Sequence, residues 1–162
     1  MKNFFFGFCF ILCAITSLHG QNLRLTPNIG YGAPILDTGH ALHLGVNPDW
    51  ALGDFFALEG QVSYLYTSVE AAFLSGERNT EHAFNVLAGG RLYVRRPEKS
   101  FRPYINLLFG VAHWREFSPL NPVRMNTTVG ASAGVFADIQ NWVVGVSVDT
   151  PGKFVFKAGY RF

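Results

Sequence analysis

The segment Phe154-Val-Phe-Lys-Ala-Gly-Tyr-Arg-Phe162 decides the fold class of this chain. Side chains of a β-strand alternate between two faces, so the aromatic and small residues at 154, 156, 158, 160 and 162 share one face. The opposite face carries the cations Lys157 and Arg161. A strand of a soluble sheet normally ends in a polar tail, whereas a membrane barrel needs an apolar side toward lipid and a polar side toward its lumen. The segment therefore favours a membrane barrel over the edge strand of a soluble sandwich.

Seven further segments alternate in the same way, and none has a useful helical period. With the last segment, the eight expected strands are residues 23–32, 40–47, 55–66, 81–95, 103–114, 126–138, 142–149 and 154–162. Most have about the 9–11 residues that cross a bilayer at a tilt. The connections between them hold Pro, Asp, Asn and Gly, which are typical of turns. The sequence predicts an all-β fold, an eight-stranded antiparallel up-and-down transmembrane β-barrel.

The composition of the two faces separates a membrane barrel from a soluble one. A lipocalin-like barrel alternates similarly, but its apolar face points inward around a ligand and its polar face meets water. Here the polar face consists mostly of small residues, with single charges at Arg24, Glu59, Arg91, Lys157 and Arg161. A solvated exterior would carry more charge. Aromatic residues near the strand ends match the interfacial girdles of membrane barrels.

The N-terminal residues have the pattern of a secretory signal peptide. A short cationic start is followed by an apolar run over residues 4–15 and by small residues before Gln21. The run is too short for a transmembrane helix. We expect residues 1–20 to be a signal peptide, cleaved between Gly20 and Gln21, and residues 21–162 to form one outer-membrane barrel domain.

Charge and cysteine content exclude other classes. Both cysteines, Cys9 and Cys13, lie in the expected signal peptide, so disulfides do not stabilise the remaining domain. The formal net charge of the whole chain is +2, without the basic stripe expected of a nucleic-acid-binding protein.

With its signal peptide, its eight alternating strands and the final Phe162 preceded by Tyr160, the chain resembles small outer-membrane barrels of diderm bacteria. These form the broad family of the outer-membrane protein A transmembrane domain. In that family the barrel-assembly machinery reads the terminal aromatic strand. The resemblance implies an assembly signal at Phe154, Phe156, Tyr160 and Phe162. It also implies two periplasmic termini, so that connections 33–39, 67–80, 115–123 and 149–152 face outward.

The charged residues of the polar face are the candidate site. The interior of an eight-stranded barrel is narrow, and buried charges must be paired. We expect Glu59 to pair with Arg91, and with Lys157 as an open alternative. Lys157 and Arg161 are expected beside Arg24 across the closing strands. This lumen ion network is interpreted as a structural plug, and a gated pore is the alternative.

Catalysis and metal binding find little support in the sequence. The lipid A deacylases that share this fold need a His and a Ser two residues apart on one strand. None of His40, His43, His82 or His113 is followed by such a Ser. His40 and His43 point to opposite faces of a strand, which makes a poor metal pair. We expect a non-enzyme without cofactor or metal.

The sequence thus predicts a monomeric barrel of the outer membrane with a structural or interaction role. Its expected partners are membrane lipid, the barrel-assembly machinery and an extracellular partner at loops 67–80 and 115–123, with no nucleic acid. Two alternatives remain, a small-solute pore and a soluble lipocalin-like carrier.

Overall fold

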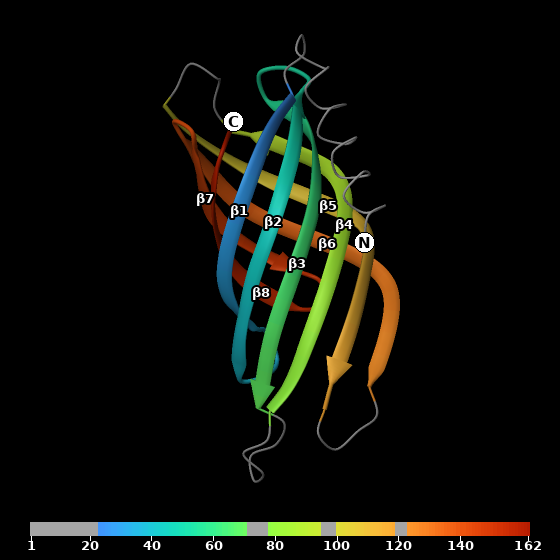
Figure 1. Cartoon of the computed structure of the whole chain (residues 1–162). Coiled ribbons are helices and arrows are strands. Elements are labelled where there is room, and N and C mark those ends of the chain that lie inside the picture. The colour runs from blue at the N-terminus through green and yellow to red at the C-terminus, as the bar shows by residue number, and fades with distance from the viewer. Residues whose placement is uncertain (1–22, 71–77, 95–99, 119–122) are drawn as a thin grey trace, which may run out of the picture.

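The chain forms a closed antiparallel barrel in which each strand pairs with its sequence neighbours and β1 closes on β8 (Figure 1). The computed structural model describes residues 23–70, 78–94, 100–118 and 123–162, so the expected signal peptide lies outside the described residues. The strands are β1 Leu23–Pro34, β2 Gly39–Ala51, β3 Phe56–Glu70, β4 Arg78–Tyr93, β5 Phe101–Phe117, β6 Arg124–Ile139, β7 Trp142–Asp149 and β8 Lys153–Tyr160. The predicted eight-stranded up-and-down barrel is confirmed.

The apolar face of every strand points outward, away from the lumen. Phe109 is 55% exposed and Ile29 is 61% exposed, whereas Arg91 is 1% exposed. A soluble carrier would have the reverse arrangement, because its apolar side chains would line the ligand site. The polar lumen argues against the lipocalin-like alternative. In the described part of the chain, no helix has the length and hydropathy for a membrane crossing.

The prediction for the end of the second strand is wrong. Pro48 and Asp49 were expected to begin a connection at 48–54, but β2 continues to Ala51. Pro48 is opposite Leu25 of β1, and Asp49 is opposite Arg24. Proline lacks an N–H, and the pairing of β2 with β3 accordingly skips residues 47 and 48. The connection shortens to residues 52–55, the length of an ordinary hairpin turn.

Many residues of the expected outer loops 67–80 and 115–123 belong to strands. Register pairs continue to Glu70 and Arg78 between β3 and β4, and to Glu116 and Arg124 between β5 and β6. Antiparallel hydrogen bonding persists through polar residues, because it uses only the backbone. Residues 71–77 and 119–122 lie outside the described part. Figure 1 shows the long hairpins at the end of the barrel opposite to the C-terminus.

Apolar clusters close the lumen on either side of its polar centre. Near the 52–55 turn, the buried side chains of Tyr93, Tyr104 and Phe136 contact one another, with ring centroids 5.1 and 5.4 Å apart. Toward the long hairpins, Leu65, Ala83 and Val155 form a second buried cluster against which Trp114 packs. The polar side chains of Glu59, Arg91 and Lys157 in the lumen are accordingly buried.

Candidate functional site

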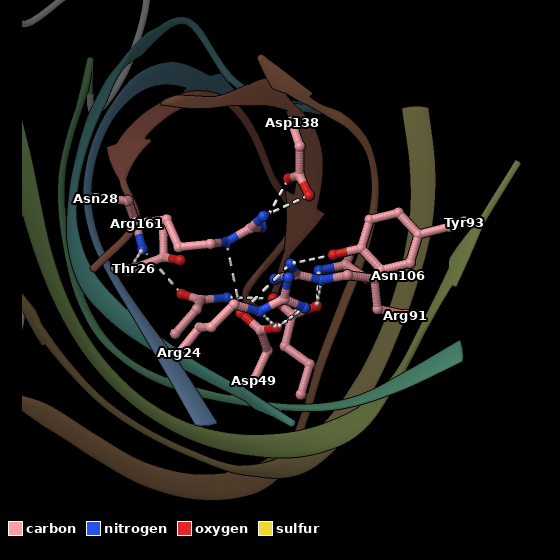
Figure 2. Close-up of polar contacts among 11 residues, drawn as sticks. Arg24, Thr26, Asn28, Asp49, Arg91, Tyr93, Asn106, Asp138 and Arg161 are labelled. Carbon is pink, nitrogen blue, oxygen red and sulfur yellow. Dashed lines mark hydrogen bonds and ion pairs between the residues drawn. The ribbon is translucent and has the colours of Figure 1, made fainter. Parts of the chain in front are cut away.

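The buried carboxylate of Asp49 is the centre of a lumen ion network (Figure 2). Its Oδ2 atom accepts a hydrogen bond from Nε of Arg24 at 2.9 Å and lies 2.6 Å from the second guanidinium nitrogen. Its Oδ1 atom lies 3.5 Å from Arg91 and 3.8 Å from Arg161. Three arginines from β1, β4 and the end of the chain therefore converge on one side chain of β2.

Glu59 of β3 is the second anion of this network. Its Oε2 atom accepts a hydrogen bond from Nε of Arg91 at 2.9 Å, and its Oε1 atom accepts one from Asn47 at 2.6 Å. Arg91 also donates to the Tyr93 hydroxyl at 3.0 Å and lies 4.2 Å above the Tyr104 ring. Such a set of partners compensates the loss of hydration that burial of a guanidinium entails.

Asp138 of β6 is the third anion. Arg161 donates to both of its carboxylate oxygens, at 2.5 and 2.7 Å, in the bidentate geometry that arginine favours. Figure 2 shows Arg161 spanning the lumen between Asp138 and Asp49. In this network three arginines, Arg24, Arg91 and Arg161, thus face three carboxylates.

A second balanced group lies beside the first. Lys157 Nζ lies 2.7 Å from Asp149 Oδ2, and Ser132 donates to the other oxygen of Asp149 at 2.6 Å. His43, which is fully buried, lies 3.4 Å from Asp149 and 2.9 Å from Asn28. Asn28 in turn donates to Asn47, the hydrogen-bond donor to Glu59, so a continuous chain of polar contacts joins the two groups.

A third group of charges, a single ion pair, lies at the mouth near the long hairpins. Lys153 Nζ is 3.1 Å from Glu81 Oε2, and both side chains are largely shielded from solvent. Little open space remains between the layers: a cavity of about 20 Å³ beside Glu59, Arg91 and Lys157 has room for about one water molecule.

The structure brings four of the five predicted lumen residues into one network. These are Arg24, Glu59, Arg91 and Arg161, whereas Lys157 contacts Asp149 and not Glu59. Sequence reasoning missed the role of the carboxylates Asp49, Asp138 and Asp149. A charge count would have found them, because buried arginines on the polar face require as many buried acids.

The outer face holds contacts that a search along single strands does not detect. His113 of β5 lies 2.9 Å from the hydroxyl of Thr127, its register partner on β6. His82 of β4 hydrogen-bonds Tyr64 of β3. No carboxylate contacts His113 among the described residues, so the pair lacks the third group that orients a catalytic imidazole. No cluster of potential metal ligands occurs in the described part of the chain.

The four aromatic residues of the expected assembly signal all point outward from β8 or its end. Phe154 and Phe156 contact each other, with ring centroids 5.4 Å apart, and Tyr160 contacts Phe162 at 5.1 Å. The backbone of Phe162 donates a hydrogen bond to Leu25 at 2.9 Å, which fixes the chain end against β1. This aromatic row is thus presented on the lipid-facing side of the closing strand.

Comparison with known proteins identifies the fold. No protein-family model and no curated protein sequence matches the chain. The structure is similar to Ail, the attachment invasion locus protein of Yersinia pestis, with a TM-score of 0.59 and 16% identity over 88% of this chain and 99% of Ail. It is also similar to the outer membrane enzyme PagL, with a TM-score of 0.53 and 17% identity over 85% of this chain and 98% of PagL.

A third similar structure is Neisserial surface protein A, with a TM-score of 0.52 and 10% identity over 86% of this chain and 94% of that protein. The chain therefore has the fold of the small eight-stranded outer-membrane barrels. One of these three proteins is an enzyme, so the fold leaves catalysis undecided.

Proposed function

We propose that this chain is an outer-membrane protein that anchors a projecting β-sheet at the cell surface for contact with a partner. The apolar exterior and the barrel fold support the membrane location. The observation that carries the interaction role is the unequal length of the strands. β5 has 17 residues and β6 has 16, whereas β7 and β8 have 8 each.

The difference in length leaves one edge of the long hairpin open. β6 pairs with β7 only from Ser132 onward, and Thr150 contacts Ala131. Within the described residues, positions 124–130 of β6 pair with β5 alone. An open strand edge offers unpaired backbone groups to another chain. We name the paired strand ends beyond Val111, residues 112–117 and 124–128, the projecting hairpin.

The lumen supports a plug and not a channel in this proposal. The charges of Arg24, Glu59, Arg91 and Arg161 are balanced within one layer by Asp49 and Asp138, and little space remains for solvent. Eight strands enclose an interior that side chains fill. Removal of one side chain of an ion pair would open space in the lumen, but it would also leave the charge of the other side chain buried and unpaired.

Truncation of the projecting hairpin tests the interaction role. Trp114 is the register partner of Asn126, so residues 115–125 can be replaced by Asn-Gly without changing the pairing below. A non-adherent bacterial strain that displays the full chain should attach to a host-cell layer, and the truncated variant should not. Both should show the heat-modifiable gel mobility of a closed barrel. Equal attachment by the two variants would contradict the proposal.

The proposal includes export through a cleavable signal peptide at residues 1–20 and a monomeric barrel without catalytic activity. N-terminal sequencing of the protein from the membrane fraction should begin at Gln21. Release of fatty acid from outer-membrane lipid by the purified barrel would contradict the non-enzymatic role.

A further inference from the structure

The outward-facing apolar surface ends at a ring of histidine and hydroxyl side chains on β2 to β6. Toward the long hairpins, the first polar outward residues are His40 on β2, Tyr64 on β3, His82 on β4, His113 on β5 and Thr127 on β6, whereas Ser68 of β3 is buried. His40 is in register with Ser68, and that row continues through Thr80 to Phe117. His82 lies two residues closer to the apolar surface than Thr80, the member of this row on β4. His113 lies four residues closer to it than Phe117, the member on β5. That progressive offset is what tilted strands require of residues at one height.

The ring marks the level of the lipid headgroups if the apolar surface spans the bilayer. Aromatic side chains with polar ends, such as Tyr64 and Tyr66, are also typical of this level. We name the outward-facing residues Tyr64, His82, His113, Arg115 and Phe117 the rim cluster. They come from three adjacent strands, β3, β4 and β5.

The rim cluster places a cation over an aromatic ring. The Arg115 guanidinium carbon lies 4.5 Å from the centroid of the Phe117 ring, a cation–π distance. Phe117 also contacts the edge of His82, with ring centroids 5.4 Å apart, and His82 hydrogen-bonds the Tyr64 hydroxyl. Arg115 is the register partner of His82. The guanidinium and the imidazole therefore lie side by side on the lipid-facing wall.

Arg115 has no carboxylate partner among the described residues. The adjacent Glu116 belongs to the opposite face of β5, which faces the lumen side. Arg24, Arg91 and Arg161, by contrast, are paired with carboxylates inside the lumen. A cation held at the boundary of a hydrocarbon layer requires an anion or water, and at this level the abundant anion is phosphate.

We propose that the rim cluster binds the phosphate group of a phosphorylated lipid in the leaflet around the long hairpins. This inference depends on the membrane location in the proposed function. The Arg115 guanidinium can donate two parallel hydrogen bonds to phosphate oxygens. His82 and His113 offer ring nitrogens beside it, and the apolar wall formed by Phe84 and Val111 accommodates the acyl chains below.

Lipid retention measured by native mass spectrometry tests this site. The full chain is reconstituted in nanodiscs of phosphatidylcholine that contain a minor fraction of diphosphoryl lipid A, and the bound lipid is counted after release. The wild-type barrel should retain lipid A at least tenfold over its fraction in the nanodisc. Arg115→Gln should lose this enrichment, and Tyr64→Phe, which removes the hydroxyl that holds His82, should reduce it.

Arg124→Gln is the matched control, because Arg124 is an exposed arginine near the same height on the other face of the neighbouring strand. It should retain lipid A as the wild type does. Equal enrichment in Arg115→Gln, or equal retention of dephosphorylated lipid A, would overturn the proposal. Displacement of the lipid by 10 mM inorganic phosphate would assign the site to free phosphate instead.

Insertion is scored separately through heat-modifiable mobility. An inserted wild-type barrel without lipid enrichment contradicts only the phosphate site. A wild-type barrel that does not insert contradicts the proposed membrane location as well.

Discussion

Replacement of Asp49 by Asn should destabilise the barrel more than any exposed charge substitution. Asp49 has a fully buried side chain and lies 2.6, 3.5 and 3.8 Å from three arginines. At an effective dielectric constant of about 20, each such pair has roughly 4–6 kcal/mol of gross Coulomb attraction. Desolvation of the carboxylate offsets several kcal/mol of this sum. Asparagine keeps the shape but leaves three arginines facing two carboxylates, so we expect a loss of about 3–5 kcal/mol in the free energy of unfolding.

The assay is equilibrium unfolding in urea of the barrel reconstituted in lipid vesicles, followed by tryptophan fluorescence. Asp37→Asn is the control, because Asp37 is exposed in the connection between β1 and β2, and it should change the free energy of unfolding by less than about 0.5 kcal/mol. The double variant Asp49→Asn/Arg24→Gln removes one charge of each sign. It should recover about 1–3 kcal/mol relative to the sum of the single variants. If Asp49→Asn is as stable as Asp37→Asn, the ion network does not stabilise the lumen.

Two further predictions concern the lumen and the chain end. In planar bilayers the wild-type barrel should give no lasting conductance step. Glu59→Ala should either conduct or unfold more easily, because Arg91 loses its 2.9 Å partner. An unchanged current trace together with unchanged stability would contradict both the plug and the pore hypotheses. Phe162→Ala should lower the amount of barrel in the membrane fraction severalfold. It should change the free energy of unfolding of the refolded protein by less than about 1 kcal/mol, because the Phe162 side chain is 76% exposed. Phe109→Ala replaces another exposed aromatic residue and is the control, and equal membrane levels of the two variants would contradict an assembly signal at the chain end.

The strands were predictable where alternation and turn chemistry agree. β7 has the predicted bounds Trp142–Asp149, because a two-residue connection precedes it and Thr-Pro-Gly follows. β2 was predicted too short, because Pro48 and Asp49 are typical turn residues whose neighbours in the barrel the sequence does not display. Only the pairing with Leu25 and Arg24 reveals that the strand continues.

The candidate site was predictable in its cations and less so in its anions. Arg24, Arg91 and Arg161 stand out because a positive charge on a strand otherwise composed of small residues requires an explanation. Asp49 and Asp138 lie near strand ends, where an acid is ordinary in a turn. Their partners are 25 and 23 residues away in sequence. Such pairings depend on how strands meet across the lumen, and local patterns do not contain that information.

The length of the hairpins is the main support for the proposed interaction role of this barrel. The 8 residues of β7 extend about 26 Å at roughly 3.3 Å per residue, and at a tilt of about 40° they cover about 20 Å of the bilayer normal. The 17 residues of β5 cover about 43 Å at the same tilt. The apolar outward run of β5 ends at Val111, so the residues beyond it contribute little to burial in lipid.

Backbone pairing stabilises the projecting hairpin, yet the unpaired edge of β6 can pair with other chains and so promote aggregation. A barrel whose only task was to seal the bilayer would be as stable with a short turn at this position. In the proposed function this exposed edge contacts another molecule, and truncation of the hairpin should separate that contact from the stability of the barrel.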